Sequence, residues 1–153
     1  MDGIREIFNF NPVLSLSVLA WVLAQVLKIV SCLVQTGKLN LGMALSSGGM
    51  PSSHSAFVCA CASSVGAVYG WSSGLFAVAV VLALVVMYDA ANVRQAAGQQ
   101  AKILNYIMAN WNQMRPEIFG EQLKELLGHT PLQVFFGAFL GVAVGLGGIH
   151  FIG

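Results

Sequence analysis

The chain has 153 residues, of which 57% are hydrophobic and only 8% are charged, and its formal net charge is +1. The mean hydropathy is +0.77, and so few charged groups cannot cover the surface of a soluble protein. The composition therefore predicts an integral membrane protein whose partners are lipids. A nearly neutral chain gives no sign of a nucleic-acid partner, and its length allows one compact domain over residues 1–153.

Four apolar stretches are predicted to be membrane crossings, at about 1.5 Å of rise per helical residue. They cover residues 13–35, 55–70, 74–91 and 132–152. Short amphipathic helices are expected over residues 2–10 and 117–127, at the membrane interface. Residues 95–111 form a polar helix that either lies against the bundle or extends the third crossing. The predicted fold is an all-α, polytopic membrane helix bundle.

Small residues recur every fourth position in two of these crossings. The first set, Ser52, Ala56, Ala60 and Ser64, begins just before the second crossing and continues into it, and the last crossing carries Gly137, Gly141 and Gly145. Ridges of this kind let membrane helices pack closely, so both are predicted to be packing faces. The three cysteines all lie in apolar segments, where they are expected to pack rather than to form a disulfide or a metal site.

The stretch Gly48-Gly49-Met50-Pro51-Ser52-Ser53-His54-Ser55 stands at the start of the second crossing. Glycines let a backbone approach a ligand, proline suits a first helical turn, and serines cap it, so free N–H groups there attract phosphate. The imidazole of His54 can exchange a proton with a bound group near neutral pH. A capped helix start with an incidental histidine explains this stretch equally well.

Other polar residues interrupt the apolar segments. Lys28 precedes the end of the first crossing by about two turns, where a charge must snorkel to the interface, pair, or line a polar cavity. Asp89 and Arg94 follow the third crossing, where an ordinary surface ion pair is the plain alternative. His129 precedes the last crossing. Counting crossings places all of these and His54 on one side of the membrane, where helix ends can converge on one pocket.

Two of these motifs resemble those of a known superfamily. The run Met50-Pro51-Ser52-Ser53-His54-Ser55 looks like the Pro-Ser-Gly-His signature of the type 2 phosphatidic acid phosphatase superfamily, which includes the vanadium haloperoxidases. The run Gly128-His129-Thr130-Pro131, followed by Gly137 and Gly141, resembles their last motif, where a nucleophilic histidine opens a glycine-rich helix. Between them, Tyr-Asp-Ala-x-x-Val-Arg and Gly-x-Gln-Ala-x-x-Leu-Asn are similar to the divergent branch of that superfamily, and the resemblance covers nearly the whole chain.

The resemblance implies a phosphatase without metal or cofactor that acts on a polyprenyl phosphate or a phosphatidate-like lipid through a phosphohistidine. His129 corresponds to the nucleophile and His54 to the general acid that protonates the leaving oxygen. Ser52 and Ser53 would hold phosphate oxygens, and Lys28 matches the lysine of the first motif. Fixed positive charge would offset the charge that develops on the phosphoryl group.

The sequence also departs from the superfamily pattern. Gln35-Thr36 and Gln122-Leu123 stand where the superfamily has phosphate-binding arginines. Arg94 and Lys38 are the residues expected to supply that charge instead.

The aspartate that orients the nucleophile is also missing. Gln133 stands in its place, and this amide can accept a hydrogen bond but carries no charge. Gln133 therefore joins the expected phosphate-binding residues, while Asp89 is the carboxylate expected to support the nucleophile.

These departures leave a second function open. The protein would keep the anion pocket without turnover and would bind or move a phosphorylated lipid. A purely structural membrane protein is a third alternative, and the sequence leaves open whether copies of the chain form a homo-oligomer.

The distribution of positive charge predicts the orientation. One side receives both termini and the turn at residues 69–74, with Arg5 as its only Lys or Arg. The other side receives Lys38, Arg94, Lys102, Arg115 and Lys124. The positive-inside rule then places the pocket at the cytoplasmic face of a bacterial-type plasma membrane.

Overall fold

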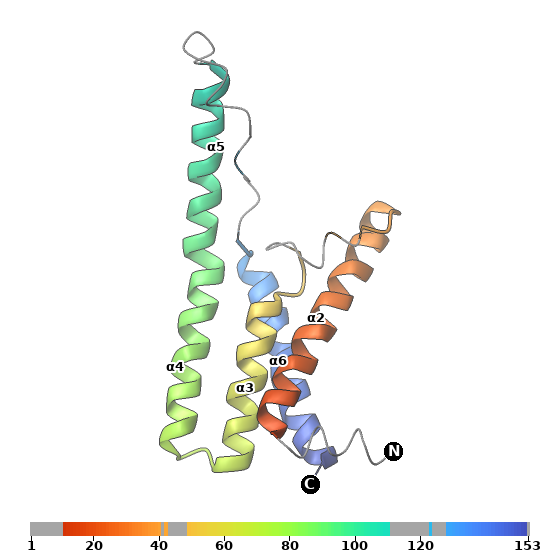
Figure 1. Cartoon of the computed structure of the whole chain (residues 1–153), viewed down its shortest axis with the longest axis vertical. Coiled ribbons are helices and arrows are strands. Elements are labelled where there is room, and N and C mark those ends of the chain that lie inside the picture. Colours follow the sequence, from red (N-terminus) through yellow and green to blue (C-terminus); the bar gives the residue numbers. More distant parts are fainter. Residues whose placement is uncertain (1–10, 41, 43–48, 111–122, 124–127, 153) are drawn as a thin grey trace.

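The computed structural model describes residues 11–40, 42, 49–110, 123 and 128–152, and every regular element among them is a helix (Figure 1). The elements are α2 (Pro12–Thr36), α3 (Ser53–Tyr69), α4 (Gly74–Tyr88), the π-helical η2 (Asp89–Val93), α5 (Arg94–Asn110) and α6 (Pro131–Ile152). The predicted all-α bundle is confirmed. The short helices expected over residues 2–10 and 117–127 lie outside the described residues and stay predictions.

Three helical stretches are long and apolar enough to cross a membrane: Pro12–Thr36, Gly74–Met108 and Pro131–Ile152. The second predicted crossing, α3, has 17 residues, or about 26 Å at the usual helical rise, against about 30 Å for a hydrocarbon core. It packs against α2, α4 and α6 and so lies at the centre of the bundle (Figure 1). The described helices thus comprise three full-length spans and one shorter central helix.

The third crossing continues into the next helix. Of the two alternatives that the sequence allowed, the structure has α5 extending α4 as one long helix that projects beyond the other helices (Figure 1). The junction is the five-residue π-helix η2, in which the backbone N–H of Arg94 bonds the carbonyl of Asp89. This widened turn absorbs one extra residue without breaking the helix.

Helix ends follow ordinary capping chemistry. The side chain of Asn11 accepts a hydrogen bond from Leu14 N at the start of α2, and Gly37 ends that helix in the left-handed conformation. Serines cap the next two helices, Ser52 at α3 and Ser73 at α4. These side chains satisfy N–H groups that the first helical turn leaves unbonded.

The two predicted small-residue ridges face each other across the interface of α3 and α6. Ser52, Ala56, Ala60 and Ser64 are each 0% exposed. A Cβ atom added to Gly137 would overlap the carbonyl oxygen of Ser52, and one added to Gly141 would overlap that of Ala56. The two backbones are therefore in direct contact, which confirms both ridges as packing faces.

We expect Gly141→Ala to destabilise the fold by about 1–3 kcal/mol, because the new methyl group forces the two backbones apart. Gly147→Ala in the same helix is the matched control, since a Cβ atom there meets nothing within 4 Å. Thermal unfolding of both variants in one detergent measures the difference. Equal melting temperatures for the two variants would contradict the close contact.

Candidate functional site

Two histidines meet where α3 and α6 begin. His54 lies in the first turn of α3 and His129 immediately precedes α6. Their ring centroids are 6.1 Å apart, at an interplanar angle of 63°. At that separation one phosphate group can contact both rings.

The backbone of His129 is held by the π-helix η2. In a regular α-helix the N–H of Arg94 would bond the carbonyl of Ala90, but here it bonds the carbonyl of Asp89. The carbonyl of Ala90 is thereby released and accepts a hydrogen bond of 2.9 Å from the backbone N–H of His129. Gly128, at φ +93°, lies so close to the backbone of α5 that a Cβ atom would not fit.

The side chain of His129 is oriented by a capping box. Thr130 and Gln133 open α6, with Thr130 Oγ1 accepting from Gln133 N at 3.3 Å and Gln133 Oε1 accepting from Thr130 N at 3.2 Å. The same Oε1 lies 3.1 Å from His129 Nδ1. Because an amide oxygen can only accept, Nδ1 carries the proton and Nε2 of the neutral ring carries a lone pair.

Nε2 of His129 has no hydrogen-bond partner in the described part of the chain. His129 is 1% exposed, and its Nε2 is a buried atom without a hydrogen bond to any described residue. The same holds for Nδ1 of His54 among these residues. Buried polar atoms are seldom left unpaired, so these two nitrogens are candidates to bind a ligand.

Burial is the main cause that lowers the pKa of His129 below its usual range. The hydrogen bond to Gln133 opposes this effect, while the positive charges of Lys28, His54 and Arg94 lower that pKa further. His129 is therefore neutral at neutral pH, which is the form in which an imidazole attacks phosphorus.

Lys28 turns into the bundle. It is 1% exposed, and its Nζ lies 3.4 Å from the hydroxyl oxygen of Ser53, to which it donates. Of the alternatives for this residue, the structure therefore shows a lysine among the helices rather than one that snorkels to the interface. It places a positive charge beside the start of α3.

Ser52 links the starts of α3 and α6. Its hydroxyl accepts from the backbone N–H and the hydroxyl of Ser55, at 3.3 Å and 3.0 Å. Its backbone N–H donates to the carbonyl oxygen of Gln133 at 3.0 Å. The structure thus engages Ser52 in capping and in joining two helices, whereas Ser53 faces Lys28.

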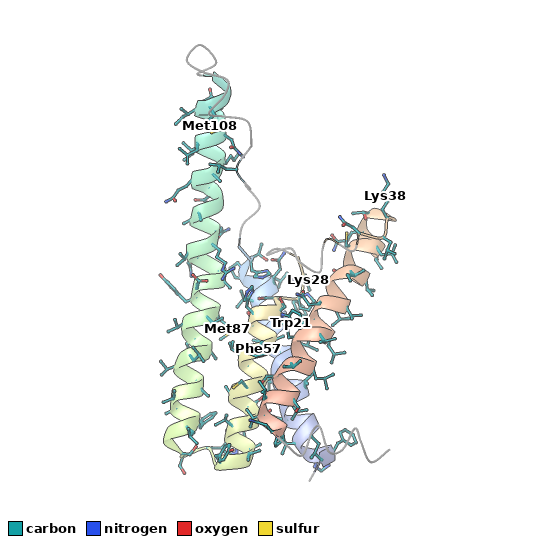
Figure 2. All side chains as sticks on the ribbon, in the orientation of Figure 1. Trp21, Lys28, Lys38, Phe57, Met87 and Met108 are labelled. Carbon is teal, nitrogen blue, oxygen red and sulfur yellow. The ribbon has the colours of Figure 1, made fainter. Side chains whose placement is uncertain are left out.

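The remaining charged residues of the predicted site are the pair Asp89 and Arg94, which lies near the histidines, and Lys38, which does not. Asp89 and Arg94 form an ion pair of 2.9 Å, and both side chains are about two-fifths exposed. Such a pair contributes little to stability, but its arginine lies close enough to lower the pKa of His129. Lys38 is exposed beyond the end of α2 and away from Lys28 (Figure 2), so the structure does not bring it to the histidines.

Sequence reasoning missed three features of this site: the carbonyl of Ala90, the close approach of Gly128 to α5, and Thr130. Only the last had a readable signal, because Thr-x-x-Gln before an apolar run is the pattern of a capping box. The released carbonyl follows from a π-turn that the sequence does not mark.

The fold and the site together define a helical membrane protein with two histidines and two cationic side chains at one end of its bundle. Residues 9–144 match the family described as "Divergent PAP2 family", and the chain belongs to that family. It is similar to "Uncharacterized membrane protein YuiD" of Bacillus subtilis (strain 168), with 38% identity over 151 residues, 92% of this chain and 95% of that protein. No solved structure matches the chain at a significant level. The family resemblance inferred from the motifs is confirmed.

We expect the ring of His129 to titrate below about pH 6.5, the reference value for histidine. Arg94→Gln should move that midpoint upward, because the variant removes a positive charge that disfavours the imidazolium. Ring-carbon chemical shifts of selectively labelled protein, followed by NMR from acid to neutral pH, measure both values. A midpoint above the reference in the unmodified protein would contradict the buried, cationic environment.

Proposed function

We propose that this protein is a phosphatase of membrane lipid phosphates that works through a phosphohistidine on His129. The observation that supports this most directly is the fixed tautomer of His129. Gln133 Oε1 accepts a hydrogen bond from Nδ1 at 3.1 Å, which leaves the lone pair on Nε2 free to attack. The centroid of the His54 ring lies 6.1 Å from the centroid of the His129 ring. The expected substrates are phosphatidate-like lipids or polyprenyl phosphates.

In the proposed reaction, Nε2 of His129 attacks the phosphorus atom and forms a P–N bond as the P–O bond to the lipid breaks. Protonated His54 gives its proton to the leaving oxygen, and the lipid alcohol departs. Neutral His54 then takes a proton from water, whose oxygen attacks the phosphohistidine and breaks the P–N bond. Inorganic phosphate leaves, and both imidazoles return to their starting state.

Positive charge supports this transfer. Lys28 and Arg94 flank the histidines closely enough to lower the pKa of His129, so they also attract the oxygens of a bound phosphoryl group. Ser53, whose hydroxyl accepts a hydrogen bond from Lys28, is the serine expected to contact a phosphate oxygen. No cofactor enters the proposed reaction.

One observation favours the second function, a protein that binds or moves a phosphorylated lipid without hydrolysing it. The residue that holds His129 is the neutral Gln133, and an amide stabilises an imidazolium less than a carboxylate does. Asp89 is already paired with Arg94. The site can therefore hold phosphate even where transfer to His129 is slow.

For the cell, we propose that the histidines face the cytoplasm of a bacterial-type plasma membrane. Lys38 follows the end of α2, and Arg94 and Lys102 lie in α5, on the same side of the bundle as the histidines (Figure 1). Lysine and arginine accumulate on the cytoplasmic side of membrane proteins.

Substitution of either site histidine tests the reaction. His129→Ala should abolish phosphate release from phosphatidate and any phosphoenzyme, whereas His54→Ala should slow release mainly from substrates with poor leaving groups, by about 10²–10⁴-fold. His150→Ala, at the opposite end of α6, is the control and should remain fully active. Full activity in His129→Ala would rule out the phosphohistidine, and phosphate binding without release by the unmodified protein would favour the second function.

Labelling of single cysteines tests the orientation. In a cysteine-free background, Lys38→Cys should be protected from an impermeant thiol reagent in intact cells, whereas Ser72→Cys should react. Both positions are exposed in the structure, so accessibility is set by the side of the membrane. The reverse pattern would place the histidines outside the cytoplasm.

A further inference from the structure

An apolar groove of about 450 Å³ lies between α2 and α6. Its walls are Leu27 and Val30 of α2 and Phe136, Phe139 and Ala143 of α6. The volume falls within the range of about 300–1,000 Å³ that is usual for small-molecule sites.

The groove opens toward the lipid bilayer. Both of its walls belong to helices that are long and apolar enough to span a membrane, and their side chains point outward, with Phe139 68% exposed. A groove with mainly apolar walls between two membrane-spanning helices is surrounded by hydrocarbon rather than water. Its natural occupant is therefore a hydrocarbon chain.

The groove adjoins the histidine site along the chain. Met50 and Pro51 line it, and they directly precede Ser52 and Ser53 in the chain. Ser31, another lining residue, donates to the carbonyl oxygen of Met50 at 2.9 Å and lies one helical turn beyond Lys28. A molecule can thus have its phosphate beside Lys28 and its chain in the groove.

We propose that this groove holds the hydrocarbon chain of the lipid whose phosphate occupies the histidine site. The inference rests on the proposed function and deepens it, because it gives the hydrocarbon chain of the lipid substrate a defined place in the bundle. From Gln133 to Ala143 the groove side of α6 extends about 15 Å along the helix axis. The substrate enters sideways from the bilayer, between α2 and α6, with its chain leading down this path.

A second apolar cavity, of about 380 Å³, supplies an internal control. It lies between α3, α4 and α6 and is lined by Leu84, Met87 and Val142 among others, with no residue of the histidine site in its walls. Val142 and Ala143 are neighbours in α6 but line different cavities. The same substitution at these two positions therefore fills one cavity or the other.

The test compares two ligands in the full-length protein purified in detergent: dioleoyl phosphatidate, and glycerol phosphate as the same headgroup without chains. Ala143→Phe should weaken binding of phosphatidate by about tenfold or more, because displacing two methylene groups from the groove suffices for that. Its affinity for glycerol phosphate should stay unchanged. Val142→Phe should alter neither affinity, as measured by calorimetric titration.

Leu27→Trp narrows the same groove from α2 and should reproduce the effect of Ala143→Phe, so the test does not depend on one variant. Unchanged phosphatidate affinity in both variants would overturn the groove proposal, and so would an equal loss in Val142→Phe. If the unmodified protein bound neither ligand, the proposed function itself would fail. Binding of both ligands with equal affinity would overturn the groove proposal alone.

Discussion

The backbone contact between α3 and α6 is the constraint on which the site depends. Between helices in a bilayer the hydrophobic effect supplies little attraction, so association depends on close van der Waals packing and hydrogen bonds. Glycines of α6 lie directly against the carbonyls of Ser52 and Ala56, and at the end of this contact Ser52 N–H bonds the carbonyl of Gln133. That bond joins the first turns of both helices, and with them His54 and His129.

A second constraint comes from the long helix that runs from α4 into α5. Its π-turn shifts the hydrogen-bond register at Asp89, and the carbonyl of Ala90 is thereby available to His129. A turn within one long helix thus holds the backbone of His129, which lies more than thirty positions later in the chain. The backbone N–H of Arg94 makes the last hydrogen bond of the same turn. The positive side chain of Arg94 therefore lies near His129.

Much of this arrangement could be predicted from the sequence because its signals are local. Apolar length predicted the helices, small residues at every fourth position predicted both packing faces, and counting crossings put His54, His129 and Lys28 at one end of the bundle. The pairing of the two ridges with each other could not be predicted, since periodicity marks a face but not its partner. The environment of Lys28 could not be predicted either. A lysine at this position can be buried among helices or snorkel to the interface, and only the packing of the helices decides between the two. Lys38 was expected at the site, but α2 carries it past the bundle.

The charge of the site bears on how a phosphoryl group would be handled in the proposed reaction. Lys28 and Arg94 are positive, and Asp89, the acidic residue nearest to Arg94 along the chain, is bound to Arg94. Such surroundings attract a phosphate dianion before any bond changes, and binding that is equally strong in the ground state and the transition state does not accelerate the reaction. When Nε2 attacks, the imidazole ring becomes cationic while Nδ1 faces only the amide oxygen of Gln133. Stabilisation of the transition state over the ground state must therefore come from two sources. His54 protonates the leaving oxygen, and Arg94 can exchange its contact with Asp89 for one with the phosphoryl oxygens. In the proposed reaction, turnover by this protein therefore depends more on the leaving group than it would with a carboxylate at position 133.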